Sequence, residues 1–207
     1  MRTRIYVDAF NLYYGSLKGT AYKWLDLLKL SKQLLRPENQ IEGIKYFTAL
    51  VTPRPGDPNQ LTRQKTYLRA LGTIRAQVVY GHYLSHVVTM YKARQEVGES
   101  PFVKVIKTEE KGSDVNIASH LLMDAFEDAY DCAVLISGDS DLATPVKMIV
   151  SRFGKKVGVL NPQQVECKAL KCIASFYKHI RQPALAASQF PAVLLDAKGS
   201  FHKPTDW

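Results

Sequence analysis

Cysteine and long apolar runs are the scarcest features of this 207-residue chain. Its three cysteines, Cys132, Cys167 and Cys172, match neither a disulfide framework nor the spacing of a zinc site. Every apolar run is well short of the roughly 18 residues that a helix needs to cross a bilayer. The chain reaches the acidic residue Asp8 within a strand-like stretch, so we expect no secretory signal. These absences predict a protein of the reducing cytoplasm that does not act in a membrane.

Charge is plentiful and unevenly distributed. The formal net charge is +9, yet residues 109–141 hold nine acidic side chains and one basic side chain, Lys111. That stretch therefore carries −8 and the remainder +17. A basic chain around an acidic island favours a polyanionic partner and a cation site within the island. The alternative is a basic protein with one acidic helix.

Short apolar runs alternate with helical patterns along the chain. Alternation of this kind predicts right-handed βαβ units and a three-layer α/β/α sandwich with a mainly parallel central sheet. The expected strands are 4–9, 44–51, 76–84, 132–137 and 156–160, and the expected helices are 24–35, 61–71, 113–129, 140–152 and 165–180. Residues 92–100 are predicted to form the tip of a hairpin whose second strand is 102–107.

The length fits one well-buried domain with an appendage. We expect the domain to span residues 1–182. Residues 183–207 are expected to form a C-terminal arm that packs on the domain or on a partner, with a turn at 196–199.

Four aspartates lie where the expected strands end or the expected helices begin. Asp8 and Asp139 follow apolar strands, and Asp141 is two residues further on. Ser113 is expected to cap the helix that begins at residue 113, which places Asp114 in its first turn, at the start of a stripe facing the sheet. Ligands bind beyond the carboxyl ends of parallel strands, so the four acids should converge there.

Four converging carboxylates repel each other unless a cation lies between them. Mg²⁺ or Mn²⁺, which prefer oxygen ligands, would relieve that repulsion. One or two such ions, about 4 Å apart if two, suit hydrolysis of a phosphodiester. Capping remains the simpler role for Asp114 or Asp141 taken alone.

Three separated motifs carry a family resemblance: YVDAFNLYYG, KGSDVNIASHLLMDA and VLISGDSDLATPVKMIVSRFGKKVGVL. In this order they resemble NYN domains, specifically the LabA-like branch of the PIN-like nucleases, over roughly residues 3–180. The resemblance implies an α/β/α sandwich and a metal-dependent ribonuclease site. It assigns the catalytic and metal-binding roles to Asp8, Asp114, Asp139 and Asp141, and a supporting or phosphate-contacting role to Asn11 and Ser137.

His120 departs from the pattern, because many LabA-like sequences carry an aspartate there. It is expected to pack, or to support the metal through a water molecule. Asp124 lies about 15 Å of helical rise from Asp114, too far to share its ion easily, so we expect it to pair with a lysine. The number of metal ions stays open.

Several residues are candidates for contacting RNA, and Tyr14 would do so by stacking on a base although packing is its simpler role. The substrate-binding candidates are Lys111, Ser113, Arg54, Arg63, Lys65 and Tyr14. A solvated surface charge is the simpler role for each basic residue alone.

Other protein classes also place two aspartates after a strand. In haloacid dehalogenase-type phosphatases Thr or Val follows the pair, and neither follows it here. Toprim domains normally carry a glutamate at the tip of the first strand, where this chain has Asp8. Both classes therefore match the sequence poorly. We predict a divalent-metal-dependent endoribonuclease acting on single-stranded or structured RNA. A non-catalytic RNA-binding scaffold and a metal-dependent DNA nuclease are the alternatives, and a homo-oligomer is left open.

Overall fold

A computed structural model describes residues 1–53, 56–95 and 98–207 of the chain. Its centre is a six-stranded sheet in the order β3-β2-β1-β6-β7-β8, in which every neighbouring pair is parallel. The strands are β1 (Arg2–Asp8), β2 (Gln40–Thr48), β3 (Gln77–Tyr80), β6 (Cys132–Ile136), β7 (Lys156–Asn161) and β8 (Phe176–His179). The predicted parallel α/β sandwich is confirmed.

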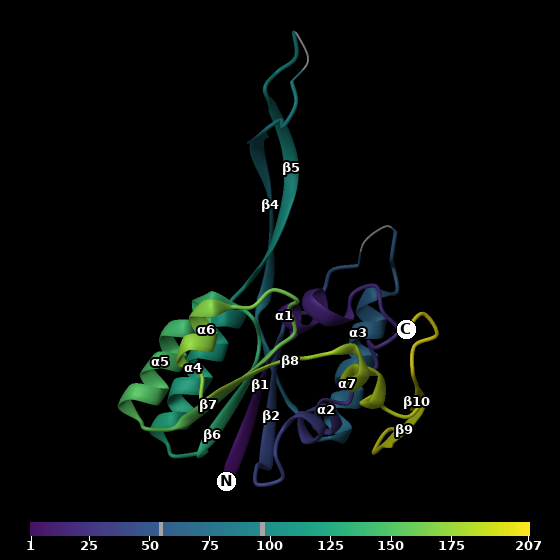
Figure 1. The fold of residues 1–207 in the computed structure, drawn as a ribbon. Helices are drawn as coiled ribbons and strands as arrows, with labels where there is room; N and C mark the ends of the chain where they lie inside the picture. Colours follow the sequence, from purple (N-terminus) through teal and green to yellow (C-terminus); the bar gives the residue numbers. More distant parts are fainter. Residues whose placement is uncertain (54–55, 96–97) are drawn as a thin grey trace.

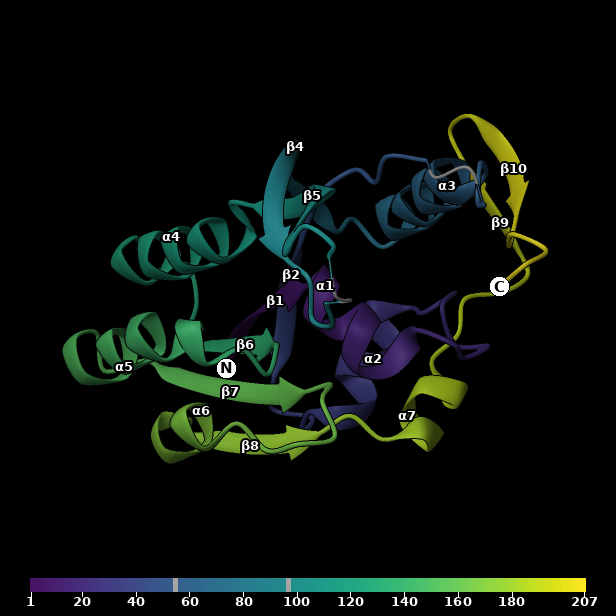
Figure 2. The ribbon, with the colours of Figure 1, turned by 90° about the horizontal axis from the view of Figure 1, so that it is seen from above.

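Helices cover both faces of the sheet (Figure 2). One face carries α4 (Ser113–Phe126), α5 (Ala143–Arg152) and α6 (Lys168–Ile173). The other carries α1 (Ala9–Leu12), which continues as the π-helical turn η1 (Tyr13–Leu17), and α2 (Leu27–Leu34), α3 (Gln60–Thr73) and α7 (Gln182–Ala187).

The alternation of side chains along each strand divides the core into two layers. On β1, Ile5 and Val7 pack with α2 and α3, whereas Tyr6 packs with α4 and α5. On β6, Val134 joins the first layer and Leu135 the second. All of these side chains are fully buried. A strand buried on both faces reads as a continuous apolar run, which is the pattern of CAVLI in β6.

Two expected elements differ in the structure. The expected helix over 165–180 ends at Ile173, and the chain then forms β8, the last strand of the sheet. Its four residues are too few to show a strand period, so the preceding helical pattern concealed it. The expected strand over 76–84 is divided at Gly81 into β3, in the central sheet, and β4 (His82–Tyr91), which leaves it.

Strand β4 pairs with β5 (Phe102–Lys111) as a two-stranded antiparallel ribbon. This ribbon stands away from the rest of the molecule (Figure 1). From here on, "the arm" means residues 82–111, and residues 183–207 are called the C-terminal segment.

The last residues pack against the face that carries α3. Phe190, Phe201 and Trp207 surround the buried ring of Trp24 with centroid separations of 5.8–6.4 Å. Strands β9 (Val193–Asp196) and β10 (Gly199–His202) form a hairpin with the predicted turn at 196–199. The C-terminal segment therefore completes the hydrophobic layer around Trp24.

Candidate metal centre

Three carboxylates from distant parts of the chain meet at the carboxyl edge of the sheet. Asp8 ends β1, Asp139 follows β6, and Asp114 lies in the first turn of α4. One oxygen of each lies within 4.8 Å of an oxygen of the other two. β1 and β6 are adjacent and parallel, so their ends reach the same edge, and α4 starts there because the arm returns the chain to it.

Asp8 is the most buried member of this group, with 3% of its surface exposed. Its Oδ1 accepts a hydrogen bond from the backbone N–H of Asn11 (2.9 Å), and its Oδ2 accepts one from the Ser137 hydroxyl (2.9 Å). Burial raises the pKa of Asp8 to about 6, with the charges of Asp114 and Asp139 adding to the effect and the two hydrogen bonds opposing it. A buried carboxylate among like charges favours a bound cation.

Asp139 belongs to the group, whereas Asp141 does not join it within the same distance. The Asp139 carboxylate accepts a hydrogen bond from the backbone N–H of Asp141 (2.9 Å) at the start of the 3-10 turn η2 (Ser140–Leu142). Asp8 caps α1 in the same way. Capping thus occupies one oxygen of each strand-tip acid.

Asp114 lies in the first turn of α4 as predicted, but the residue that precedes this helix is not the predicted one. Gly112, in the left-handed region with φ 95°, is the residue before the helix. Ser113 is already helical and buried, and its hydroxyl donates to Glu110 (2.8 Å). The buried stripe of α4 runs through Ser113, Ile117, Leu121 and Ala125, so it begins at Ser113 rather than at Asp114, which is exposed. Both the predicted Ser113 cap and the core-facing position of Asp114 are wrong.

Partial burial and the neighbouring charges of Asp139, Glu110 and Asp141 raise the pKa of Asp114. Asp141 therefore acts on this site through its charge, although its carboxylate is outside the three-residue group. A cation at the group would offset the repulsion that raises both pKa values.

Asn11 connects the loops that follow three strands. Its Oδ1 accepts hydrogen bonds from the backbone N–H of Gly138 (2.8 Å) and from Gln163 Nε2 (3.1 Å). A Cβ at Gly138 would lie 2.4 Å from Asn161 Oδ1, so only glycine fits there. Sequence reasoning missed Asn161, which ends the strand β7, and Gln163, which follows it, although the argument from strand ends would have found both.

His120 contacts a different set of residues from those that hold the three clustered carboxylates. Its ring packs edge-on against Phe47 and its Nδ1 is 3.1 Å from Lys45 Nζ. Lys45 also donates to Asp124 (2.6 Å), which confirms the predicted lysine pairing of Asp124. Tyr6 and Arg4 complete this network around the buried Asp124 carboxylate.

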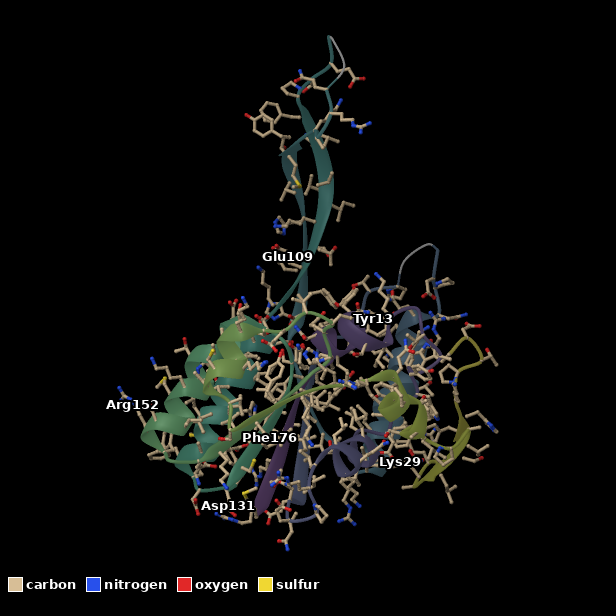
Figure 3. All side chains as sticks on the ribbon, in the orientation of Figure 1. Tyr13, Lys29, Glu109, Asp131, Arg152 and Phe176 are labelled. Atoms are coloured by element: carbon tan, nitrogen blue, oxygen red, sulfur yellow. The ribbon has the colours of Figure 1, made fainter. Side chains whose placement is uncertain are left out.

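The acidic island of the sequence is therefore dispersed in space. Asp131 lies at the end of the body farthest from the arm, whereas Glu109 lies on the lower part of the arm (Figure 3); Asp131 binds Arg2 there. Asp128 joins the same ion-pair group, and Glu109 pairs with Lys107 and Lys111. Four of the nine acids of the island, Glu109, Asp124, Asp128 and Asp131, are therefore paired with basic side chains. The charges of Glu110, Asp139 and Asp141 act on Asp114 at the site.

The RNA-contact candidates differ in their exposure and in their contacts with other residues. Ser113 is buried and its hydroxyl is engaged, so the structure contradicts a contact from its side chain. Arg63 pairs with Asp57 and Asp206, and Lys111 pairs with Glu109. Lys65 is exposed on α3. Arg54 lies outside the described residues.

Tyr14, for which the sequence favours packing as the simpler role, is 59% exposed. Its ring contacts Tyr13 edge-on, at 5.3 Å between centroids, and carries Lys18 Nζ at 5.0 Å. Both tyrosines follow Asp8 on the continuous segment α1–η1.

Comparison with known proteins gives one sequence relative and one structural neighbour. The chain is 33% identical over 239 aligned positions to 6-hydroxy-3-succinoylpyridine 3-monooxygenase HspA of Pseudomonas putida, covering all of this chain and 75% of that protein. A protein of unknown function from Vibrio parahaemolyticus, VPA0982, shares the fold with a TM-score of 0.57 at 20% identity, covering 87% of this chain and 93% of that one. In the part of the chain that the structure describes, no helix is long and apolar enough to cross a membrane.

The NYN domain family model matches residues 2–179, which contain the whole central sheet and all three clustered aspartates. The chain is a member of the NYN domain family.

Proposed function

We propose that this chain is a divalent-metal-dependent endoribonuclease that hydrolyses phosphodiester bonds in single-stranded or structured RNA. The observation that carries the proposal is the convergence of Asp8, Asp114 and Asp139 within 4.8 Å in a NYN-family chain of net charge +9. We assign the chain to the LabA-like branch from its three motifs. We further propose a nuclease domain over 1–182, an appended segment over 183–207 and a cytoplasmic site of action.

The donor set fits Mg²⁺ or Mn²⁺. All three groups are carboxylates, and hard divalent ions prefer oxygen ligands. Asp8, Asp114 and Asp139 would hold the ion. When bound, such an ion lowers the pKa of a water molecule and stabilises negative charge on phosphate oxygens.

The chain's own residues supply positioning. Ser137 and the N–H of Asn11 hold the Asp8 carboxylate in place, and Asn11 ties the loops after β6 and β7 to α1. Asp141, which is exposed in the turn η2 before α5, is the acid that we assign to orienting the attacking water. Tyr14 offers an exposed ring on which a base can stack, a contact suited to single strands.

A second candidate function comes from the 33% identity with a protein named as a pyridine monooxygenase. The candidate is oxygenation of a hydroxylated pyridine acid by this chain. The donor set argues for hydrolysis instead, because non-haem iron oxygenases typically bind their metal with two histidines and one carboxylate. The candidate site among the described residues consists of three aspartates.

The test incubates purified protein with labelled RNA and with DNA of the same sequence, in Mg²⁺, Mn²⁺ or EDTA. We expect metal-dependent RNA cleavage by the native chain and its loss in Asp139→Asn. Asp131→Asn, which makes the same change at the opposite end of the sheet, should retain cleavage.

Cleavage that survives both EDTA and Asp139→Asn would sink the mechanism. RNA binding without cleavage under any metal would favour the scaffold alternative, and cleavage of DNA alone would favour a DNA nuclease. A parallel reaction with 6-hydroxy-3-succinoylpyridine, oxygen and a reductant tests the second candidate by oxygen consumption.

A further inference from the structure

The arm exposes an unusual amount of apolar surface for a two-stranded ribbon. Its strands are ten residues each, about 33 Å long at the usual rise per residue. Seven large apolar side chains on it are exposed: Leu84, Val87, Met90, Tyr91, Phe102, Val103 and Ile106. Figure 3 shows side chains standing out from both sides of the ribbon along its length.

Both faces of the ribbon carry apolar cross-strand pairs. The register places Val87 opposite Ile106 and Tyr91 opposite Phe102 on one face. Because neighbouring residues point to opposite faces, Met90 and its partner Val103 lie on the other. A ribbon of two strands is marginal in water, and three or more strands are usually needed for stability. The arm therefore has the composition of a structure that is completed by further strands.

The root of the arm is fixed to the body. The backbone N–H of Gly81 donates to Thr48 O (2.8 Å), and Asn116 of α4 donates to Tyr80 O (3.3 Å). The Tyr83 ring packs edge-on against Phe10, with 5.8 Å between centroids. The fold thus presents the arm in a defined direction.

The two edges of the ribbon differ in charge. Strand β5 contains five charged residues, whereas β4, with the sequence HYLSHVVTMY, contains no Lys, Arg, Asp or Glu. Charged side chains, lysine above all, are the usual protection of an exposed edge strand against pairing with another chain. Among the described residues, no third strand pairs with either edge. Strand β4 is thus the unprotected edge.

Charge also argues against RNA as the occupant of the arm. Residues 82–111 hold five basic and four acidic side chains, a formal charge of +1. Lys92, Lys107 and Lys111 are each paired with a glutamate of the arm. A surface whose lysines are neutralised within the arm lacks the strong positive charge on which RNA binding depends.

We propose that the arm is the association surface for a second copy of this chain, joined through antiparallel pairing of β4 with the β4 strand of the other copy. An antiparallel pair of identical strands satisfies two-fold symmetry, the commonest arrangement of homodimers. The four-stranded sheet reaches the strand number that the isolated ribbon lacks. Pairing places the exposed apolar side chains of β4, namely Leu84, Val87, Met90 and Tyr91, beside those of the other copy, where cross-strand contacts stabilise the joined sheet.

The test measures the mass of the full chain in solution by sedimentation velocity over a concentration series up to about 100 μM, which covers the micromolar range typical of weak interfaces. We expect a dimer of the 23.3 kDa chain. Val87→Lys should raise the dimer dissociation constant by at least about 30-fold, the effect of removing a central interface residue. The matched control is Val165→Lys, because Val165 is 80% exposed outside the arm and its change should leave the mass unaltered.

A second variant protects the test against a folding defect. Thr89→Lys keeps every apolar side chain and adds one charge to the β4 edge, so it should also weaken the dimer. Circular dichroism verifies that each variant is folded. RNA affinity is measured on the same samples, and an added lysine should not lower it if the arm contacts only protein.

A native chain that stays monomeric throughout the series would overturn the proposal. So would a dimer that neither arm variant weakens. An unchanged mass combined with altered RNA affinity in both arm variants would assign the arm to RNA instead. These results do not depend on nuclease activity. The proposed association surface is therefore tested independently of the proposed function.

Discussion

Replacing Asp8 by asparagine should stabilise the metal-free protein while abolishing its metal binding. Folding places this carboxylate in a buried position beside Asp114 and Asp139, which raises its pKa from 3.8 to about 6. A group whose pKa is raised on folding favours the native state below its unfolded value and loses that contribution as the pH rises through its folded value. Near pH 7 the ionised Asp8 therefore costs about 3 kcal/mol of stability, at about 1.4 kcal/mol per pKa unit.

Asparagine removes that cost at nearly constant volume. Its carbonyl oxygen can still accept from the N–H of Asn11, but its amide cannot accept from the Ser137 hydroxyl as the carboxylate does. One lost hydrogen bond costs about 1 kcal/mol. We expect Asp8→Asn to raise the free energy of unfolding by about 2 kcal/mol in EDTA at pH 7, as the difference between these two effects.

Urea denaturation in EDTA at pH 7 and pH 5 measures this effect. The native chain should gain stability relative to the variant as the pH falls from 7 to 5, since Asp8 becomes protonated. Mg²⁺ or Mn²⁺ at pH 7 should stabilise the native chain and leave Asp8→Asn unchanged. A variant that is less stable than the native chain in EDTA at both pH values would refute the reasoning, as would a native chain that metal does not stabilise.

Two further predictions concern residues near the centre. Asp124→Ala should destabilise the protein by about 3 kcal/mol in urea denaturation, because it leaves Lys45 and Arg4 without their shared partner in a partly buried network; a loss below 1 kcal/mol would contradict this role. Gly138→Ala should abolish RNA cleavage, while circular dichroism shows that the fold is intact. The added Cβ would lie 2.4 Å from Asn161 Oδ1 and would displace the loop that carries Asp139. Full activity would show that the loop adapts.

The sequence predicted the parallel sheet because its inner strands are buried on both faces over most of their length. Such strands form continuous apolar runs that interrupt helical patterns, as at β1, β6 and β7. The same feature located Asp8 and Asp139, since a polar residue after a buried run marks the carboxyl end of a strand. The lysine pairing of Asp124 followed from its position on the helix.

Helix phase and chain ends were harder to predict. In the first turn of α4 the buried side chain is Ser113 rather than the predicted Asp114. β8 has only four residues, too few for a period to emerge. Both errors arise where a local pattern is short and a tertiary contact decides the structure.

The sequence by itself determined the fold class and the identity of the strand-tip acids, because burial on both faces of a sheet dictates residue type locally. Only the tertiary structure decided which acids act together. It joins Asp8, Asp114 and Asp139 within 4.8 Å, yet it places Asp131 at the far end of the sheet and neutralises Glu109 on the arm. Charge density along a chain is a one-dimensional quantity, whereas repulsion between carboxylates depends on their distances in space.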